Sequence, residues 1–286
     1  MKTFFNISLF FLCGGLLFLS CTKIDEPYAT VKSVIVDTNF RTVLLEDYTG
    51  HKCPNCAPAG TMANSIQENY HGQVFALAVH AGSFARPMPN DPHFSADFTS
   101  PAGDEWNSPT GFDLEPLGKP RGMINRKLYK DNISCQPTEW NSAVKIAVAL
   151  PKIAVISVGN VYSEATMTLS STVSVKFIQP FTGHVTLTVC ILEDSLYGGQ
   201  ENNVPPQPIP IIENYLFMHV LRGSLNGSYG ELIVANPTVN SVFSKQYSLN
   251  FTDNTWIPKQ CHVLAFISDE DTYEILHVAK AAVIKR

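Results

Sequence analysis

The sequence predicts two domains of different class, an α/β domain followed by an all-β domain built as a sandwich. The chain has 286 residues, which is long enough for two domains of ordinary size. Its first half alternates apolar, strand-like runs with a helix-like segment between residues 42 and 79. After residue 150 the pattern changes to short alternating runs separated by turn signals. We therefore expect one domain over residues 32–150 and a second over residues 151–286.

The N-terminus reads as a targeting segment over residues 1–20. Lys2 precedes an apolar run, residues 9–19, which is too short to span a bilayer as a mature helix. Residues 17–21, LFLSC, resemble a bacterial lipobox, in which the signal is cut before a cysteine that carries the lipid. Cys21 is therefore the expected lipidation site, and residues 21–31 are the expected tether. An ordinary cleaved signal peptide and a retained membrane anchor are the alternatives.

Composition limits the function classes. Hydrophobic residues make up 45% of the chain and charged residues 16%, which is typical of a globular protein and not of a disordered one. The formal net charge is −5, and the sequence contains no run of Lys and Arg. Phosphate backbones are bound by clustered positive charge, so we expect no nucleic-acid partner.

The expected α/β domain has the order strand, strand, helix, strand, insert, strand, helix. Met62, Ile66 and Tyr70 are spaced four apart on one face of the first helix. The insert, residues 81–117, carries six prolines, and we expect it to contain short helices near 93–98 and 103–106 and to cap the site described below. The expected strands are 34–36, 42–47, 74–79 and 122–128, and the expected helices are 57–70 and 138–150.

The all-β domain is expected to be an antiparallel sandwich of the immunoglobulin-like type. Gly159-Asn160 is typical of a two-residue hairpin turn between the first two strands. The Pro-rich stretch over residues 195–230 contains residues 213–223, which we expect to run back over the first domain. The expected strands are 152–158, 161–169, 172–177, 184–192, 245–251, 262–267 and 275–283.

The chemistry-bearing motif is Cys53-Pro54-Asn55-Cys56, which follows a strand and a turn and opens a helix. This arrangement is the thioredoxin-like redox signature. Free N–H groups and the positive end of the helix dipole favour the thiolate of the first cysteine. Cys53 is thus the expected exposed nucleophile, and Cys56, one turn further on, the resolving cysteine. His51 and Lys52 precede the motif and are expected to add positive charge.

Asp47 and Pro120 complete the candidate catalytic set. Asp47 lies six residues before Cys53, at the spacing of the buried acid of thioredoxins, which takes a proton from the resolving cysteine. The alternation of Val43, Leu45 and Asp47 places the carboxyl group on a strand face with apolar neighbours. Pro120 precedes a strand, as does the cis-proline of thioredoxin folds that exposes backbone to a substrate peptide. A trans turn proline is the alternative.

Cysteine usage fits an exported protein. The seven cysteines are Cys13, Cys21, Cys53, Cys56, Cys135, Cys190 and Cys261. Removing the signal and lipid positions leaves five, an odd number, so a free thiol is expected besides a Cys53–Cys56 disulfide. Cys190 and Cys261 lie in two similar β-like runs, and whether they pair is left open by the sequence.

Other uses of a CxxC motif fit the sequence less well. A structural zinc site needs four ligands, and the sequence offers neither a second CxxC nor an HxxxH. Haem attachment requires a histidine after the second cysteine, and residue 57 is Ala. We expect no cofactor and no metal. A static disulfide that only staples the turn remains as the competing interpretation.

Three blocks carry a resemblance to a known family: LLEDYTGHKCPNCAPA, GKPRGMINR and HVLRGSLNGSYGE. Together they resemble the outer membrane protein 28-related lipoproteins of Gram-negative bacteria. The resemblance implies a thioredoxin-like domain followed by a β-rich region, held by a lipid at the outer membrane and facing the periplasm or the cell surface. The family is named largely by its location, so the resemblance implies architecture and location more than activity. Thr49 and Lys52 occupy positions where thioredoxins usually carry tryptophan.

Two functions from different classes follow. The first is thiol–disulfide exchange with the thiols or disulfides of exported proteins, carried out by Cys53, Cys56, Asp47 and Pro120. The second is a surface binding or adhesin-like lipoprotein in which the β domain meets a partner and the disulfide is structural. In both cases the chain contacts the membrane through its lipid.

Overall fold

The structure is a computed structural model that describes residues 39–203, 211–252 and 255–285. The targeting segment, the expected lipid site Cys21, the tether and the strand expected at 34–36 lie outside these residues. Among the helices of the described residues, none is both long enough and apolar enough to cross a membrane.

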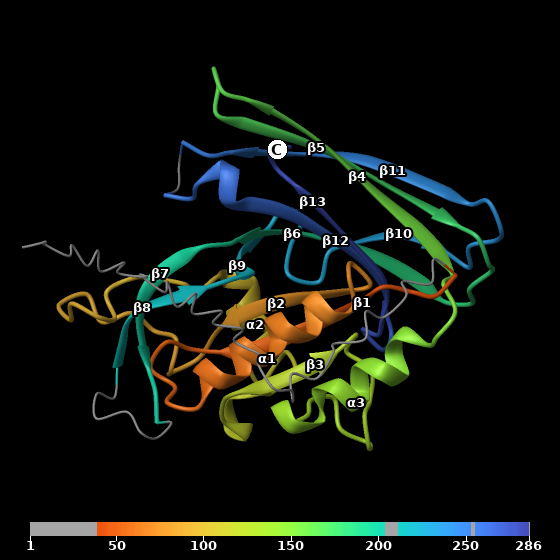
Figure 1. The fold of residues 1–286 in the computed structure, drawn as a ribbon. Helices are drawn as coiled ribbons and strands as arrows, with labels where there is room; N and C mark the ends of the chain where they lie inside the picture. The colour runs from red at the N-terminus through yellow and green to blue at the C-terminus, as the bar shows by residue number, and fades with distance from the viewer. Residues whose placement is uncertain (1–38, 204–210, 253–254, 286) are drawn as a thin grey trace, which may run out of the picture. The chain divides into compact units, whose positions relative to one another are not determined.

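The described chain is rich in β structure and has few helices (Figure 1). The helices are α1 (Cys56–Asn69), α2 (Pro101–Asn107) and α3 (Pro137–Val148), with the 3-10 helices η1 (Glu115–Leu117) and η2 (Pro258–Gln260). The strands are β1 (Val43–Thr49), β2 (Val74–His80), β3 (Arg121–Ile124), β4 (Ala154–Ser163), β5 (Thr168–Phe177), β6 (His184–Glu193), β7 (Leu196–Glu201), β8 (Ile211–Phe217), β9 (Val220–Ser224), β10 (Glu231–Ala235), β11 (Val242–Asn250), β12 (Cys261–Asp269) and β13 (Ile275–Ala282).

One mixed sheet connects the two halves of the sequence. Within the described residues it has eight strands in the order β13-β12-β6-β9-β2-β1-β3, with β10 added beside β6. β1 and β2 are parallel, β3 is antiparallel to β1, and β9 joins β2 through Val220 opposite Ala78. The described residues all belong to one compact unit, so the two regions expected as domains share a sheet.

The two faces of this sheet bury different cores. On one face α1 and α3 pack against β1 and β2, where Ile66 and Trp140 contact the side of the sheet that carries Val43 and Leu45. On the other face Trp106 of α2 joins a cluster drawn from both halves of the chain. Side chains alternate between faces along a strand, which is why β1, apolar throughout its first three residues, supplies both cores.

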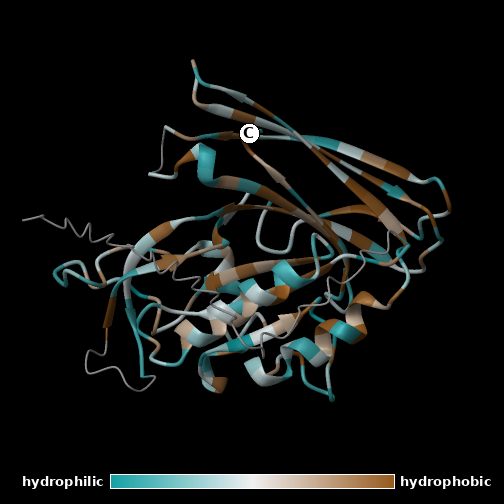
Figure 2. Ribbon diagram, in the orientation of Figure 1, coloured by the Kyte–Doolittle hydropathy of each residue, from teal (hydrophilic) through white to brown (hydrophobic). Residues whose placement is uncertain are grey.

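A second, three-stranded sheet covers β6, β12 and β13. Its order is β11-β5-β4, and its inward residues Leu169, Val173, Val175 and Phe177 alternate along β5 with outward ones. These four residues share one hydrophobic core with β6 and β12. Figure 2 shows the hydrophobic residues concentrated on the strands of the large sheet and alternating with hydrophilic ones along the covering strands.

Several elements differ from the sequence prediction. Gly159-Asn160 is not a hairpin turn, because β4 runs through it with Gly159 opposite Thr172. The Asn160 side chain donates to the carbonyls of Ala281 and Ala282, which fixes it in the strand. The turn comes later, at residues 164–167. The helix expected at 93–98 is absent, and the stretch predicted as a Pro-rich gap contains β7, β8 and β9.

Candidate redox site

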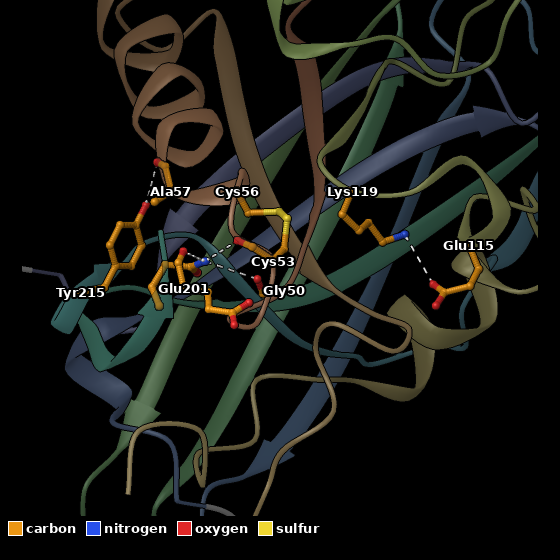
Figure 3. The surroundings of a disulfide bond; sticks show 9 residues. Gly50, Cys53, Cys56, Ala57, Glu115, Lys119, Glu201 and Tyr215 are labelled. Carbon is orange, nitrogen blue, oxygen red and sulfur yellow. Dashed lines mark hydrogen bonds and ion pairs between the residues drawn. A yellow bond between two sulfur atoms is a disulfide. The ribbon is translucent and has the colours of Figure 1, made fainter. Parts of the chain in front are cut away.

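The two cysteines of the motif are joined by a disulfide at the start of α1 (Figure 3). β1 ends at Thr49, the chain turns, and Cys56 begins the helix. The Cys56 amide donates to the Cys53 carbonyl at 3.2 Å, which closes the turn. Gly50 is required, since a Cβ there would lie 2.5 Å from the carbonyl carbon of Phe84. Strand, turn, disulfide and helix start therefore follow in the predicted order.

Both cysteines are buried. Cys53 is 1% exposed and Cys56 is 2% exposed, so the expectation of an exposed Cys53 is wrong. The insert contacts the CxxC turn, because the Lys52 amide donates to the Phe84 carbonyl at 3.1 Å and the rings of Phe94 and Phe98 pack against His51. These contacts agree with the prediction that the insert caps the site. The β7–β8 hairpin, whose described residues are 196–203 and 211–217, also contacts the CxxC turn, and sequence reasoning did not recognise it.

The β7–β8 hairpin is hydrogen-bonded to the CxxC turn through backbone groups. The Glu201 amide donates to the His51 carbonyl at 2.8 Å. The Asn203 amide donates to the Pro54 carbonyl at 2.9 Å. The chain at the end of β7 thus donates backbone hydrogen bonds to two carbonyl groups of the CxxC turn.

Two hairpin side chains reinforce these contacts. Gln200 is 1% exposed, and its amide nitrogen donates to the Cys53 carbonyl at 2.9 Å. Figure 3 shows the Tyr215 hydroxyl pointing at Ala57 on the first turn of α1, where it donates to the carbonyl at 3.2 Å. The expectation that residues 213–223 run back over the first region is confirmed by this contact and by the pairing of Val220 with β2.

His51 does not supply the expected positive charge. Its side chain is fully buried between the rings of Phe94 and Phe98, with ring centroids 5.3 and 5.8 Å away. Burial lowers the pKa of His51 below its usual value, so the ring is neutral near pH 7. Lys52 is half-buried and is the remaining cation next to the motif.

Asp47 is buried, as predicted. It lies on β1 with 3% of its surface exposed, and its Oδ1 has no hydrogen-bond partner among the described residues. Burial raises the pKa of Asp47 from 3.8 to about 7, and the positive charge of Lys119 pulls it in the opposite direction. The carboxyl group therefore holds and releases a proton near neutral pH.

Pro120 follows a cis peptide bond and immediately precedes β3, as predicted. β3 pairs with the end of β1 that leads to the disulfide, placing Gly122 opposite Asp47. The neighbouring Lys119 has a 1% exposed side chain that forms an ion pair with Glu115 at 3.8 Å. Figure 3 shows its ammonium group directed at Glu115 and away from the disulfide.

A cavity of about 30 Å³ adjoins the disulfide on its inner side. Asp47, Cys56, His80 and Tyr215 line it together with residues of β8. A buried water needs roughly 10–15 Å³ and polar partners, so the cavity has room for one or two waters. His80 is 2% exposed, its ring nitrogens have no partner among the described residues, and burial lowers its pKa to about 3. A water here would meet orphaned groups of both Asp47 and His80.

Sequence reasoning missed Gln200, Tyr215 and His80 as neighbours of the motif. His80 ends the strand parallel to β1, in register with Thr49, and the carboxyl ends of parallel strands lie at one edge of a sheet. That signal is present in the sequence, although on its own a histidine after a strand is more typical of an ordinary polar residue. Gln200 and Tyr215 lie in the Pro-rich stretch, where no periodicity marks the strands.

The remaining cysteines described are Cys135, Cys190 and Cys261, and all three are free and buried. A Cys190–Cys261 disulfide is excluded because the two side chains enter different cores on opposite faces of the sheet. Register explains this, since Cys190 lies opposite Leu264, three residues beyond Cys261. Within the described ranges, no group of three or more His, Cys, Asp or Glu side chains is arranged to hold a metal ion.

Two solved structures are similar to this chain, and the first of them supports the fold. A structural-genomics protein from Agrobacterium tumefaciens matches with a TM-score of 0.51 and 10% identity, over 87% of this chain and 98% of its own. A domain of the outer membrane lipoprotein Omp28 from Porphyromonas gingivalis matches with a TM-score of 0.31 and 19% identity, over 46% of this chain and 88% of its own. No curated protein matches the chain.

The family comparison covers more than half of the sequence. The family described as "Outer membrane protein Omp28" matches residues 111–286, which include β3 with its preceding cis-proline and every strand after it. The block that contains Pro120 and the block that begins at His219, both quoted above for their resemblance, lie inside this range. The chain belongs to the Omp28 family of outer membrane proteins.

Proposed function

We propose that this protein exchanges thiols and disulfides with exported polypeptides at Cys53–Cys56. The observation that carries the proposal is the buried carboxyl group of Asp47, which shares a cavity with Cys56. An orphaned buried carboxyl costs stability, and a disulfide that only staples a turn has no use for a proton acceptor beside it. A resolving cysteine needs such a proton acceptor, because it must lose a proton before it attacks and regain one when it leaves.

The proposed roles follow from this geometry. In the oxidising direction a polypeptide thiolate attacks Cys53 Sγ, the bond to Cys56 breaks, and the Cys56 thiolate takes the proton of Asp47. A second polypeptide thiolate then attacks the mixed disulfide, and Cys53 leaves as a thiolate while the polypeptide keeps the new disulfide. In the reducing direction Cys53 attacks a polypeptide disulfide, and Cys56, deprotonated by Asp47, resolves the mixed disulfide. Pro120 would align the polypeptide backbone.

The proposal includes a thioredoxin-like arrangement for residues 32–150 and an immunoglobulin-like sandwich for residues 151–286. The first is supported by parallel β1 and β2 around α1, followed by β3 and α3 on the same sheet. The second is supported by the three-stranded sheet packed over β6, β12 and β13. The match to the Agrobacterium tumefaciens protein supports the fold alone.

The proposed location is the outer membrane, with the chain held by a lipid on Cys21 and facing the periplasm or the cell surface. The family assignment and the lipobox-like residues 17–21 support this. The partners are exported proteins that carry thiols or disulfides, in a compartment where disulfides persist.

A second function is favoured by a different observation, the burial of both sulfurs. A surface binding or adhesin-like lipoprotein would use Cys53–Cys56 as a structural disulfide, and structural disulfides are typically inaccessible. In that case the β-rich region would carry the binding surface.

Trapping separates the two functions. A Cys56→Ser variant, expressed in its own cell envelope, lacks the resolving sulfur and is expected to accumulate mixed disulfides with exported proteins. The matched control is the double variant Cys53→Ser with Cys56→Ser, which has no sulfur at the motif. Adducts that appear in the single variant and not in the double variant support exchange. Equal adduct levels in both contradict it and favour the structural disulfide.

A further inference from the structure

The burial of Cys53 sets a condition on any exchange reaction. A thiolate attacks a sulfur along the line of the bond that breaks, so it must reach Cys53 Sγ directly. With Cys53 1% exposed, no protein sulfur makes that approach while the cover is in place. Either the insert or the β7–β8 hairpin must move aside.

The hairpin is the more separable of the two covers. β7 and β8 form a two-stranded sheet of their own, and such a pair is marginally stable without outside support (Figure 1). The insert, in contrast, is tied into the main sheet where Thr99 bridges His80 at the end of β2. Among the described residues, β7 and β8 form no ladder with the main sheet, although the hairpin also contacts the insert, where the Gly199 amide donates to the His93 carbonyl at 3.0 Å and Phe217 packs against Phe98. Opening of the hairpin therefore separates it from both the CxxC turn and the insert.

The chain bends sharply at each end of the hairpin. Ser195, before β7, has φ +63°, and His219, after β8, has φ +57°. These left-handed residues mark sharp bends where the hairpin leaves the main sheet. Asp194 accepts a 2.6 Å hydrogen bond from the His219 amide, which holds the two bends together. The two ends of the hairpin are therefore fixed next to each other.

The contacts that hold the hairpin are those an extended polypeptide would make. Glu201 and Asn203 donate backbone N–H groups to carbonyls of the CxxC turn, and β-addition uses the same donors on an extended segment. We propose that the β7–β8 hairpin is an in-chain occupant of a polypeptide site at the CxxC turn. The partner is an extended, cysteine-containing segment with free backbone N–H groups, which displaces the hairpin as it binds. This inference rests on the proposed function and names its substrate class.

The first test measures reduction of Cys53–Cys56 by dithiothreitol in the folded protein. One dithiothreitol thiolate attacks Cys53 Sγ, and Cys56 leaves as a thiolate. The second dithiothreitol thiolate then attacks the mixed disulfide, which closes the reagent into its cyclic disulfide and releases Cys53 as a thiolate. The variant Gln200→Ala with Tyr215→Phe removes the side-chain hydrogen bonds from Gln200 to the CxxC turn and from Tyr215 to α1, and it is expected to be reduced on the order of tenfold faster. Tyr197→Ser, at a 64% exposed position of the same hairpin, is the matched control and should be reduced at the wild-type rate.

Equal rates in the double variant and wild type overturn the proposal. A second measurement uses the unmodified, oxidised chain. Hydrogen exchange of the Glu201 and Asn203 amides reports release of the hairpin, and dithiothreitol reduction should need the same opening. The proposal is supported if the opening equilibrium derived from amide exchange equals the one derived from the reduction rate. Reduction that outpaces exchange of both amides shows that Cys53 becomes accessible with the hairpin in place, which also overturns it.

The substrate class has its own probe. Two unstructured peptides, each with one cysteine, are compared as thiol donors to the wild-type disulfide: one with ordinary flanking residues and one with prolines, which lack the N–H group. The first is expected to react about tenfold faster, and equal rates contradict the polypeptide site. A different result is expected if the proposed function itself is wrong. The hairpin would then still control the rate of dithiothreitol reduction, but no exchange with polypeptides would occur, even in the double variant.

Discussion

Replacing Asp47 by Asn tests the electrostatic basis of the candidate site. The carboxyl group is buried, and its pKa is raised from 3.8 in the unfolded chain to about 7 in the folded one. The folded state therefore binds the Asp47 proton more tightly than the unfolded state does. The stabilisation that the protonated Asp47 carboxyl group gives the folded state is fully present below pH 3.8 and is lost as the pH rises through about 7.

The magnitude follows from the two pKa values. They differ by roughly three pH units, and each unit is worth about 1.36 kcal/mol, so ionising Asp47 costs the folded state on the order of 4 kcal/mol. About 3 kcal/mol of this cost arises between pH 5 and pH 8.5. The amide group of the variant cannot ionise. The free energy of unfolding of Asp47→Asn, relative to wild type, should therefore rise by about 3 kcal/mol over that interval.

The assay is urea unfolding at pH 5 and pH 8.5 with the disulfide kept oxidised. Only the change with pH in the difference between variant and wild type tests the raised pKa, since any packing effect of the amide group is the same at both pH values. A difference between variant and wild type that stays constant with pH would refute the assignment of a raised pKa to Asp47. The proposed proton transfer to Cys56 would then lose its physical basis.

Three further predictions concern the scaffold. Glu46→Gln leaves the buried guanidinium of Arg126 without a counter-charge, so the free energy of unfolding measured in urea should fall by about 3 kcal/mol or more. Lys130→Ala, which removes an exposed ion pair, should leave the urea midpoint unchanged. Gly122→Ala places a Cβ 2.1 Å from Trp140 Nε1 and should lower the free energy of unfolding by about 1–3 kcal/mol in the same assay. Gly159→Ala, whose Cβ would lie 3.9 Å from the Thr172 carbonyl oxygen, should be tolerated, and equal costs would contradict the packing described. Burial raises the pKa of Cys135 to about 11, so iodoacetamide at pH 8 should leave it unmodified until the chain unfolds, and rapid modification of the native protein would show that it is exposed.

The sequence predicted the site best where local chemistry decides the structure. The CxxC at a helix start, the buried acid six residues earlier and the proline before β3 are each set by spacing along one segment. The apolar run of β2 and the four-residue spacing of the helix after Cys56 likewise placed their elements within a few residues.

Prediction failed where distant contacts decide the structure. Gly159 and Asn160 have the composition of a turn, yet cross-strand pairing and the bonds from Asn160 to the last strand keep them in β4. β7 and β8 carry weak periodicity, and within the part of the chain that the structure describes they pair with each other alone and contact the CxxC turn. The Cys53 carbonyl accepts a hydrogen bond from Gln200, about 150 positions away, and no local pattern reports such a contact.

The reduction potential of Cys53–Cys56 tests the central claim most directly. Structural disulfides of exported proteins typically lie below about −300 mV, and exchange-active pairs lie above it. Equilibration of the folded protein with dithiothreitol or glutathione buffers, followed by quantification of the two thiols, gives the value. The account predicts a potential above about −300 mV, whereas a potential below that value would contradict it and identify the disulfide as a staple.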